Sequence, residues 1–395
     1  PRPPGRGPWA RVGRRVAHAG RVAPGPAGAR RIASRAVSAA TARIAPWQIG
    51  AIGLTALLSA LAIALATVGA TDPAVFAVAA LATVGLAWLV GLSTEQLAAV
   101  SSPKVSAALN VAFGNIAELV LVLLAVREGL GDVAKASIAG SVLGNALFVM
   151  GLCFVVGGVR HGVQRFHREI AGLNAVLLAV AVLGLVIPTI FDAFAEGASN
   201  DRLQGLSDGV SVIFIILYAL FMLYFFRSGE AGHDAEGAHG NPWPVKVALG
   251  ALLVAGVGVG VLGEILIGAL EPTAEAVGLS PVFMGLIAIP VIGNLAEHLV
   301  SVQLAAKGQM DFAVNIAMGS TLQVVMLIAP ILALVSPLLG DSVPLTFTPL
   351  EIVALGGGAI VVGLVAADGE STWIEGASLL AVYSMVAIAA LLWPA

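Results

Sequence analysis

The sequence predicts an all-α, polytopic membrane protein of about 11 transmembrane helices, and three observations carry this prediction. Hydrophobic residues make up 58% of the chain and charged residues only 11%, whereas soluble domains carry about 25% charged residues. Apolar runs near the ~20 residues needed to cross a bilayer recur along the chain. A short acidic motif also occurs twice within these runs, at a fixed spacing.

Eleven apolar runs are long enough to form transmembrane helices. Two of them begin with a capping box, Thr348 with Glu351 and Thr372 with Glu375, so we expect both glutamates to cap helices rather than bind an ion. The predicted spans are about 48–69, 74–92, 104–127, 132–157, 169–191, 207–226, 245–270, 281–306, 311–336, 350–366 and 373–393.

The lysines and arginines that flank the spans predict their orientation. If the N-terminus is cytoplasmic, seven of these residues lie at cytoplasmic ends and three at the other ends. We therefore expect the N-terminus in the cytoplasm and, with an odd number of spans, the C-terminus outside. The seven are Lys104, Arg160, Arg165, Arg168, Arg227, Lys246 and Lys307, and the three are Arg127, Lys135 and Arg202.

Two segments of the chain are polar rather than apolar. Residues 1–46 contain ten arginines and no Asp or Glu, which predicts a basic, disordered tail. A cytosolic tail or an imprecise chain start is favoured over a targeting peptide or a patch drawn to anionic lipid. Residues 227–244 form the longest polar connection, which we expect to be a solvated linker between two halves.

An acidic motif is repeated in two of the apolar runs. Residues 114–118 read Gly-Asn-Ile-Ala-Glu and residues 293–297 read Gly-Asn-Leu-Ala-Glu, 179 positions later. The same offset continues without gaps over a helix-turn-helix length, which indicates an internal repeat of the kind common in membrane transporters. An odd number of intervening crossings predicts opposite orientations for the two copies. Further pairs at this offset are Gly129 with Gly308, Asp132 with Asp311, Gly140 with Gly319 and Ser141 with Ser320.

The glutamates of the motif are candidate ion-binding residues. Each lies near the middle of its predicted span, where an ionised carboxylate is costly and usually faces a functional cavity. An asparagine three residues earlier shares the helix face of each glutamate, and the preceding glycine permits a close backbone approach or a local break. The candidate metal-binding residues are Glu118, Glu297, Asn115, Asn294, Gly114, Gly293, Ser141 and Ser320.

Oxygen ligands with about two negative charges suit a hard divalent cation such as Ca²⁺. The sequence contains no Cys/His set with zinc spacing, so softer metals match the pair poorly. The side chains of Ser141, Ser320, Thr321, Asn145 and Gln323 could supply further oxygens. Small polar residues also mediate close helix packing in membranes, and that alternative stays open.

The same carboxylates are also expected to bind protons. Acidic groups held close together in a low-dielectric cavity raise each other's affinity for protons, so protons and the cation compete for one site. Combined with alternating access, this competition gives exchange. His298 has no counterpart in the first copy and could join Glu118 and Glu297 in proton coupling, or it could be fixed in a helix contact. Glu95 and Glu264 could belong to an ion path or be solvated or paired acids.

These motifs resemble the signature helices of the calcium/proton exchangers (CAX type) of the calcium/cation antiporter superfamily. The resemblance covers about residues 48–395 and leaves out the basic tail. It is carried by residues 113–119 and 293–298, continuing through 308–311 and 319–320. Weaker similarity extends to residues 93–95, 164–166, 368–370 and 373–376.

The resemblance implies two inverted five-helix repeats, residues 74–226 and 245–395, after an extra first transmembrane helix at 47–73. It also implies export of Ca²⁺ from the cytosol driven by proton entry, with Glu118 and Glu297 as the principal carriers. The expected location is a bacterial plasma membrane, or a vacuolar-type membrane in a eukaryote.

Three other functions fit the sequence less well than calcium/proton exchange. A sodium/calcium exchanger would show a core of Ser/Thr-Ser-x-Pro-Glu type, and a membrane-embedded hydrolase would need a nucleophile-activating set or a metal motif such as His-Glu-x-x-His; neither is present. A passive cation channel fits inverted repeats less well. Gly144 stands where the family tends to have a serine, which bears on ion selectivity.

The expected partners are therefore Ca²⁺, protons and the lipid bilayer. We expect no enzymatic activity, no resident cofactor and no nucleic-acid partner, and the sequence leaves a homo-oligomer open. The single cysteine, Cys153, excludes an intrachain disulfide.

Overall fold

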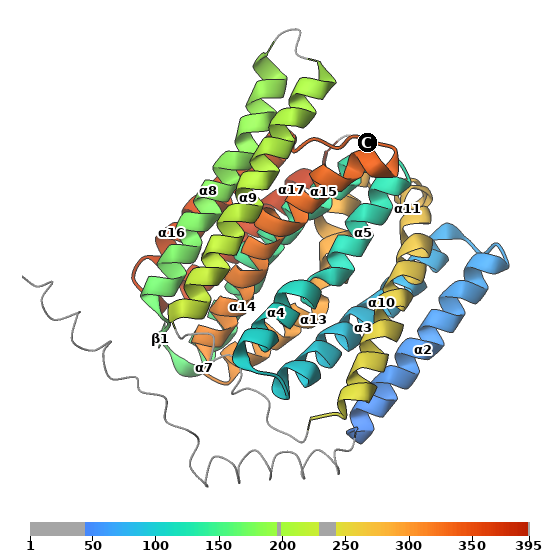
Figure 1. The fold of residues 1–395 in the computed structure, drawn as a ribbon, viewed down its shortest axis with the longest axis horizontal. Coiled ribbons are helices and arrows are strands. Elements are labelled where there is room, and N and C mark those ends of the chain that lie inside the picture. Colours follow the sequence, from blue (N-terminus) through green and yellow to red (C-terminus); the bar gives the residue numbers. More distant parts are fainter. Residues whose placement is uncertain (1–43, 196–198, 229–241, 394–395) are drawn as a thin grey trace, which may run out of the picture.

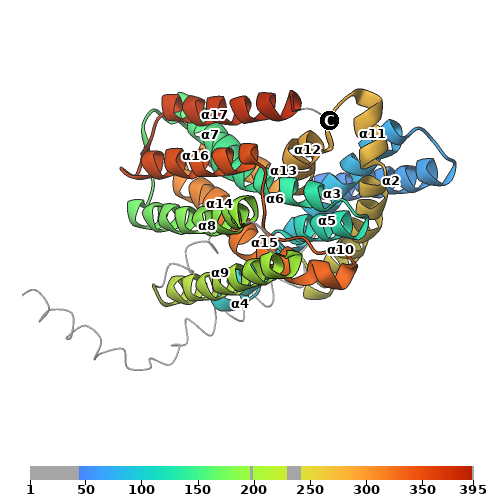
Figure 2. The ribbon, with the colours of Figure 1, turned by 90° about the horizontal axis from the view of Figure 1, so that it is seen from above.

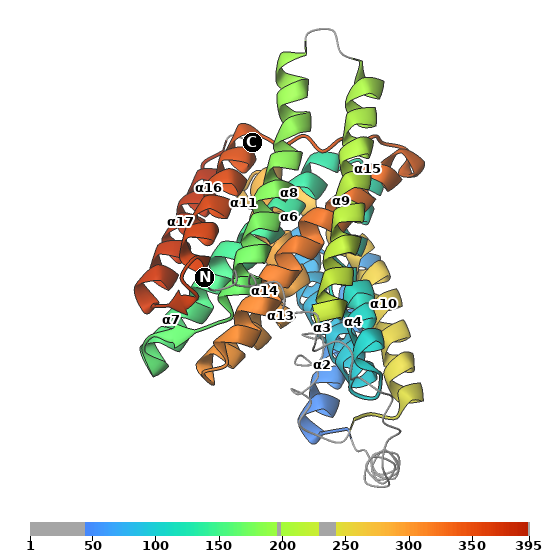
Figure 3. The ribbon, with the colours of Figure 1, turned by 60° about the vertical axis from the view of Figure 1, so that its left-hand side comes forward.

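The computed structural model describes residues 44–195, 199–228 and 242–393. Within them, 11 helices are long and apolar enough to cross a membrane, which confirms the predicted all-α class and number of spans. Two helices are longer than predicted: α3 continues to Ala99 and α9 begins at Asn200. Helices α8 and α9 project beyond the neighbouring helices as a hairpin (Figures 1 and 3). The predicted tail and most of the predicted linker lie outside the described residues.

The elements follow the order expected from the apolar runs. Up to the linker they are α2 (Pro46–Thr67), α3 (Asp72–Ala99), α4 (Pro103–Phe113), α5 (Ile116–Arg127), α6 (Gly131–Leu143), π-helix η3 (Gly144–Val149), α7 (Met150–His161), β1 (Gln164–Arg165), α8 (Arg168–Phe194) and α9 (Asn200–Ser228). After it come α10 (Val245–Gly268), α11 (Leu270–Val277), α12 (Pro281–Phe283), π-helix η6 (Met284–Ala288), α13 (Ile289–Ala306), α14 (Met310–Gln323), π-helix η7 (Val324–Ile328), α15 (Ala329–Val335), 3₁₀-helix η8 (Ser336–Leu339), α16 (Pro349–Ala366), β2 (Glu370–Ser371) and α17 (Trp373–Leu391).

The helices that carry the repeated motif lie at the centre of the bundle. Helices α2, α3 and α10 pack together on one side, while α7 with α17 and α8 with α16 form the other. Between them, α13 contacts α3, α5, α6, α7 and α14 (Figure 2). The motif helices α5 and α13 therefore meet inside the protein, away from the surface that faces lipid.

Each half of the chain contains a π-helix at the same place in its repeat. η3 in the first half and η7 in the second half coincide at the 179-residue offset. π-Helical turns are rare and occur often at functional sites. Both follow directly after the serine-bearing helices, α6 and α14.

The repeated motif itself adopts different backbones in the two halves. In the first half the helix is interrupted at Gly114 and Asn115, and Asn115 has φ −110° and ψ 27°. In the second half Gly293 and Asn294 lie inside the continuous helix α13. Glycine and asparagine are weak helix formers in both copies, so helix propensity alone does not decide where the break forms.

A side chain from the opposite half stabilises the break in the first copy. At the break, the Gln323 amide nitrogen donates to the Val111 carbonyl at 2.8 Å, a backbone acceptor that the interruption leaves without a helical donor. The position matching Gln323 in the first half is Gly144, which has no such donor. The position matching Val111 is Pro290 in α13. Proline provides no backbone N–H, and the π-helix η6 ends just before it.

The two halves also differ in how closely their backbones approach. A Cβ added at Gly140 in α6 would collide with the backbone carbonyl of Leu286 in η6. At the matching Gly319 in α14, an added Cβ would meet nothing within 4 Å. A glycine is thus required for close contact at the α6–η6 crossing but not at its repeat counterpart.

Two loops that the resemblance singled out separately meet at one end of the bundle. β1 pairs antiparallel with β2, with Gln164 opposite Ser371 and Arg165 opposite Glu370. The Arg165 guanidinium contacts the Glu370 carboxylate at 3.0 Å. This short sheet joins the connection before α8 to the connection before α17, and so ties the two halves together.

Candidate functional site

The two motif glutamates come from different halves and converge at the α5–α13 contact. Glu118 lies in the first turn of α5 and is 2% exposed. Glu297 lies within α13 and is partly buried. A Cβ added at Gly293 would lie 3.8 Å from the Cβ of Glu118, so the second motif packs directly against the first acid. The inverted repeat therefore brings both carboxylates into one buried region.

Amide and hydroxyl groups surround these acids, and one contact crosses between the halves. The Asn294 Nδ2 donates to Ser141 Oγ at 3.2 Å, and both side chains lie beside the Glu118 carboxylate. The Ser320 hydroxyl donates to Glu297 Oε2 at 2.6 Å. Each serine thus reaches the motif helix that packs against it, as a shared ion site requires.

Several polar atoms in this region have no partner among the described residues. Both carboxylate oxygens of Glu118 and both amide atoms of Asn115 are buried and make no hydrogen bond of ordinary geometry. Buried polar groups are normally satisfied, and each exception calls for a ligand, water or strain to explain it. Carboxylate and amide oxygens are the donor types that a hard cation prefers.

The broken helix gives the two acids different electrostatic surroundings. Glu118 lies in the first turn of α5, where the free backbone N–H groups and the helix dipole favour negative charge. Glu297 lies in the interior of α13 and gains no such end effect. Its carboxylate is instead held by the Ser320 hydroxyl. Gly114 lies in the break, so the local break that the sequence allowed forms in the first copy only.

His298 lies beside the acids but is turned into a separate cluster. Its Nε2 lies 3.0 Å from Asn145 Oδ1, while its Nδ1 is buried without a partner. The ring packs edge-on against Phe148, with centroids 6.4 Å apart, and Phe148 packs against Tyr383 at 5.1 Å. From the sequence, both proton coupling and a fixed helix contact were open for this histidine. The structure shows the helix contact, between His298 and Asn145. His298 is connected to Glu297 only as the next residue of α13.

Other candidate residues take different positions. Thr321 donates its hydroxyl hydrogen to the Ala317 carbonyl of its own helix. Glu264 is paired with Arg127 at 2.6 Å near the ends of α10 and α5. Of the two roles open for this acid, an ion path or a solvated or paired acid, the structure shows the pairing. Glu351 and Glu375 form the predicted capping boxes.

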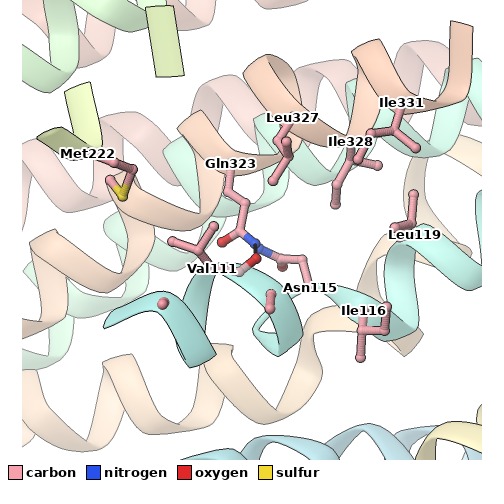
Figure 4. A pocket seen from close by; sticks show the side chains of 11 residues that line it. Val111, Asn115, Ile116, Leu119, Met222, Gln323, Leu327, Ile328 and Ile331 are labelled. Atoms are coloured by element: carbon pink, nitrogen blue, oxygen red, sulfur yellow. Dashed lines mark hydrogen bonds between the residues drawn. The ribbon is translucent and has the colours of Figure 1, made fainter. Parts of the chain in front are cut away.

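Two features of the site were not predicted from the sequence. The role of Gln323 as a cap on the Val111 carbonyl depends on a contact across 212 positions, and Figure 4 shows its amide directed at the broken helix. The aromatic neighbours of His298 were also missed, although Phe148 and Tyr383 stand within apolar spans where aromatic residues are otherwise ordinary packing groups.

The described residues contain no cluster of three or more His, Cys, Asp or Glu side chains placed to hold a metal ion. With two carboxylates only, a bound cation would need amide, hydroxyl or backbone oxygens as well. This composition favours a weakly held, exchangeable ion over a structural metal.

Comparison with known proteins gives consistent matches over nearly the whole apolar part of the chain. The family described as sodium/calcium exchanger protein matches residues 71–227 and 247–392. A Ca²⁺/H⁺ antiporter of Aphanothece halophytica is 36% identical over 335 residues, covering 80% of this chain and 90% of that protein. The Ca²⁺/H⁺ antiporter ChaA of Bacillus subtilis is 38% identical over 322 residues, covering 79% and 90%.

A solved structure extends this similarity to the fold. The structure of native YfkE superimposes with a TM-score of 0.76 at 36% identity, and the match covers 87% of this chain and 99% of that chain. The long sequence match, the 11 spans and the paired acidic motifs together place the protein in the sodium/calcium exchanger family, among relatives that include Ca²⁺/H⁺ antiporters.

Proposed function

We propose that this protein is a secondary active antiporter that exchanges cytosolic Ca²⁺ for protons by alternating access. The observation that carries the proposal is the convergence of Glu118 and Glu297, one from each half, in a buried region where the Glu118 oxygens make no hydrogen bond of ordinary geometry. The names of the relatives, Ca²⁺/H⁺ antiporters, support the same reading.

The proposed site binds Ca²⁺ through the two carboxylates and nearby neutral oxygens. Glu118, Glu297, Asn115 and Asn294 are the assigned principal ligands, with Ser141 and Ser320 contributing hydroxyls and Gly114 and Gly293 contributing backbone. Two carboxylates neutralise one divalent ion, and the neutral oxygens complete the 6–8 ligands that Ca²⁺ takes.

Exchange follows from competition for these carboxylates. When the Ca²⁺ leaves, two negative charges remain close together in a medium of low dielectric, where their repulsion is strong. Protons relieve that repulsion, so the site returns loaded with protons rather than empty. Inverted repeats supply the second requirement, because they form two related conformations that open to opposite sides. In this cycle His298 adjusts proton coupling.

The proposal includes the arrangement of the chain in the membrane. Residues 74–226 and 245–395 form the two repeats, joined by the linker at 227–244 and preceded by the first helix at 47–73. The basic residues flanking the spans favour a cytoplasmic N-terminus. Relatives from bacteria favour a plasma membrane.

Sodium/calcium exchange is the second candidate, because the matching family carries that description. The sequences at the site favour protons. Both motif copies read Gly-Asn-x-Ala-Glu, and Gly144 has no hydroxyl where a further oxygen could hold Na⁺. A channel or an embedded hydrolase has no comparable support.

The test uses the full chain reconstituted in vesicles loaded with acidic buffer. A pH gradient, acidic inside, should drive Ca²⁺ uptake, and collapsing the gradient with a protonophore should abolish it. An outward Na⁺ gradient at equal pH should not substitute. Raising the proton concentration on the Ca²⁺ side should increase the Ca²⁺ concentration needed for half-maximal uptake, because protons occupy the same carboxylates. Uptake that is driven by Na⁺ and indifferent to pH would replace this proposal with sodium/calcium exchange.

A further inference from the structure

A cleft of about 400 Å³ lies beside the broken helix, outside the cluster of acids. It is bounded by α4 and α5 on one side, by η7 and α15 on another and by Met222 of α9 (Figure 4). Its volume falls within the range of about 300–1,000 Å³ that is usual for sites of small ligands. Neither Glu118 nor Glu297 lines it.

The lining of the cleft is apolar and offers little to a hydrated ion. Nine of its 11 lining residues are Ala, Val, Ile, Leu or Met, among them Leu119, Leu327 and Ile331. Of the two polar residues, Gln323 is engaged in a hydrogen bond and Asn115 is buried. The Gln323 amide nitrogen is bound to the Val111 carbonyl, and Asn115 is only 3% exposed. Apart from Asn115, which the acid site already uses, the lining offers a hydrated cation little replacement for its water ligands.

Beside the second motif copy, aromatic side chains fill the corresponding place. At the 179-residue offset, Leu119 corresponds to His298 and Leu327 to Phe148. There, Phe148 packs against both His298 and Tyr383, with ring centroids 6.4 and 5.1 Å apart. Beside the first motif copy two leucines stand where two rings stand beside the second copy, and a cleft is left.

The outer side of the cleft adjoins the surface that faces the bilayer. α9 is among the least buried of the spans. Leu220 and Leu223, on either side of Met222, are 55% and 44% exposed. In a transmembrane helix such exposed leucines contact lipid tails, so hydrocarbon is the solvent available at the cleft.

We propose that the cleft binds an acyl chain of a bilayer lipid, which takes the place that Phe148 and Tyr383 occupy beside the second motif copy. An empty apolar cavity forfeits van der Waals contacts along its whole lining, and a hydrocarbon chain restores them. The chain would lie between the broken helix α4–α5 and η7–α15. Movement of these elements past one another would then require the chain to shift or leave, which couples lipid to the transport cycle.

The first experiment uses the reconstituted full chain in vesicles that contain a phospholipid with a photoactivatable group in its acyl chain. After illumination, mass spectrometry should locate adducts on peptides carrying Leu119 and Leu327. Leu327→Phe introduces the residue that stands at the matching position, Phe148, and fills the cleft, so these adducts should fall severalfold. The matched control is Ile213→Phe on α9, at a position 61% exposed; it should leave the cleft adducts unchanged. Equal labelling in Leu327→Phe and wild type would overturn the proposal.

A second measurement separates lipid from water without depending on the filled variant. Cys153 is the sole cysteine and is buried, so Cys153→Ala gives a background in which Leu327→Cys can be probed alone. The new thiol should react with a membrane-soluble maleimide and resist a charged, water-soluble thiol reagent. Rapid reaction with the charged reagent would identify the cleft as a water-filled ion route and overturn the lipid assignment.

Discussion

The two repeats carry the same acidic motif, yet they surround it differently. In the first, the helix breaks at Gly114 and the acid lies at a helix N-terminus with no partner for its oxygens. In the second, the helix is continuous and Ser320 holds the acid. Two acids in nearly the same local sequence can thus differ in charge stabilisation, which suits the proposed binding and release of both a cation and protons.

The largest effect is expected from neutralising either acid. Glu118→Gln and Glu297→Gln each remove one of the two charges that balance Ca²⁺, so gradient-driven Ca²⁺ uptake should be lost in both while the protein still inserts. Uptake by reconstituted vesicles measures this, with thermal unfolding as the control for folding. Full activity in one variant would show that the two acids are not equivalent and would remove that residue from the site.

The next effect concerns the glycines at matching positions in α6 and α14. Gly140→Ala places a methyl group against the Leu286 carbonyl and should destabilise the protein by about 1–3 kcal/mol or more, since the clash is with backbone. Gly319→Ala enters open space and should change stability by less than about 0.5 kcal/mol. Thermal unfolding in detergent compares the pair. Equal destabilisation would contradict the asymmetry of the two crossings.

Gln323 provides a smaller and more local test. Gln323→Ala leaves the partly buried Val111 carbonyl without its donor, which should cost about 1 kcal/mol, the lower end of the range for an unsatisfied acceptor. The matched variant Gly144→Ala, in the other repeat, removes no hydrogen bond and meets no neighbour within 4 Å, so it should be close to neutral. Unfolding midpoints and Ca²⁺ uptake measured together would tell whether the cap supports the fold only or also the site.

The smallest expected effect lies at the end of the motif helix in the first repeat. The Arg127–Glu264 pair is 2.6 Å long, but both side chains are about half exposed. Arg127→Ala should therefore cost at most about 1 kcal/mol, and less at high salt. The second repeat has Ala306 at the matching position. A loss of several kcal/mol in the free energy of unfolding would contradict this expectation, because it would mean that the ion pair stabilises the α5–α10 contact more than its half-exposed side chains predict.

Much of the fold could be predicted from local sequence. Long apolar runs fix the number of spans because each span must bury its backbone polar groups within its own helix. The capping boxes at Thr348 and Thr372 could be predicted because the partner glutamate of each lies only three residues away. The position of α9 was predicted less well, because its first turns, near Asp201 and Arg202, are polar and project with the hairpin.

The candidate site was only partly predictable for the same reason. The repeat and the two mid-span acids identified Glu118 and Glu297 and the asparagines beside them. The contacts that distinguish the two acids come from distant parts of the chain. Asn294 reaches Ser141 across 153 positions, and no periodicity within a helix encodes that distance.

By itself, therefore, the sequence determined the number of spans, the internal repeat and the pair of acids, since hydrophobic length and residue type are local properties. Only the tertiary structure showed which copy of the motif breaks. Gly-Asn is equally weak in both helices, and the break in the first copy is stabilised by Gln323, which donates from the other half of the chain. A helix can open in the membrane interior where another segment supplies the hydrogen bond that it gives up.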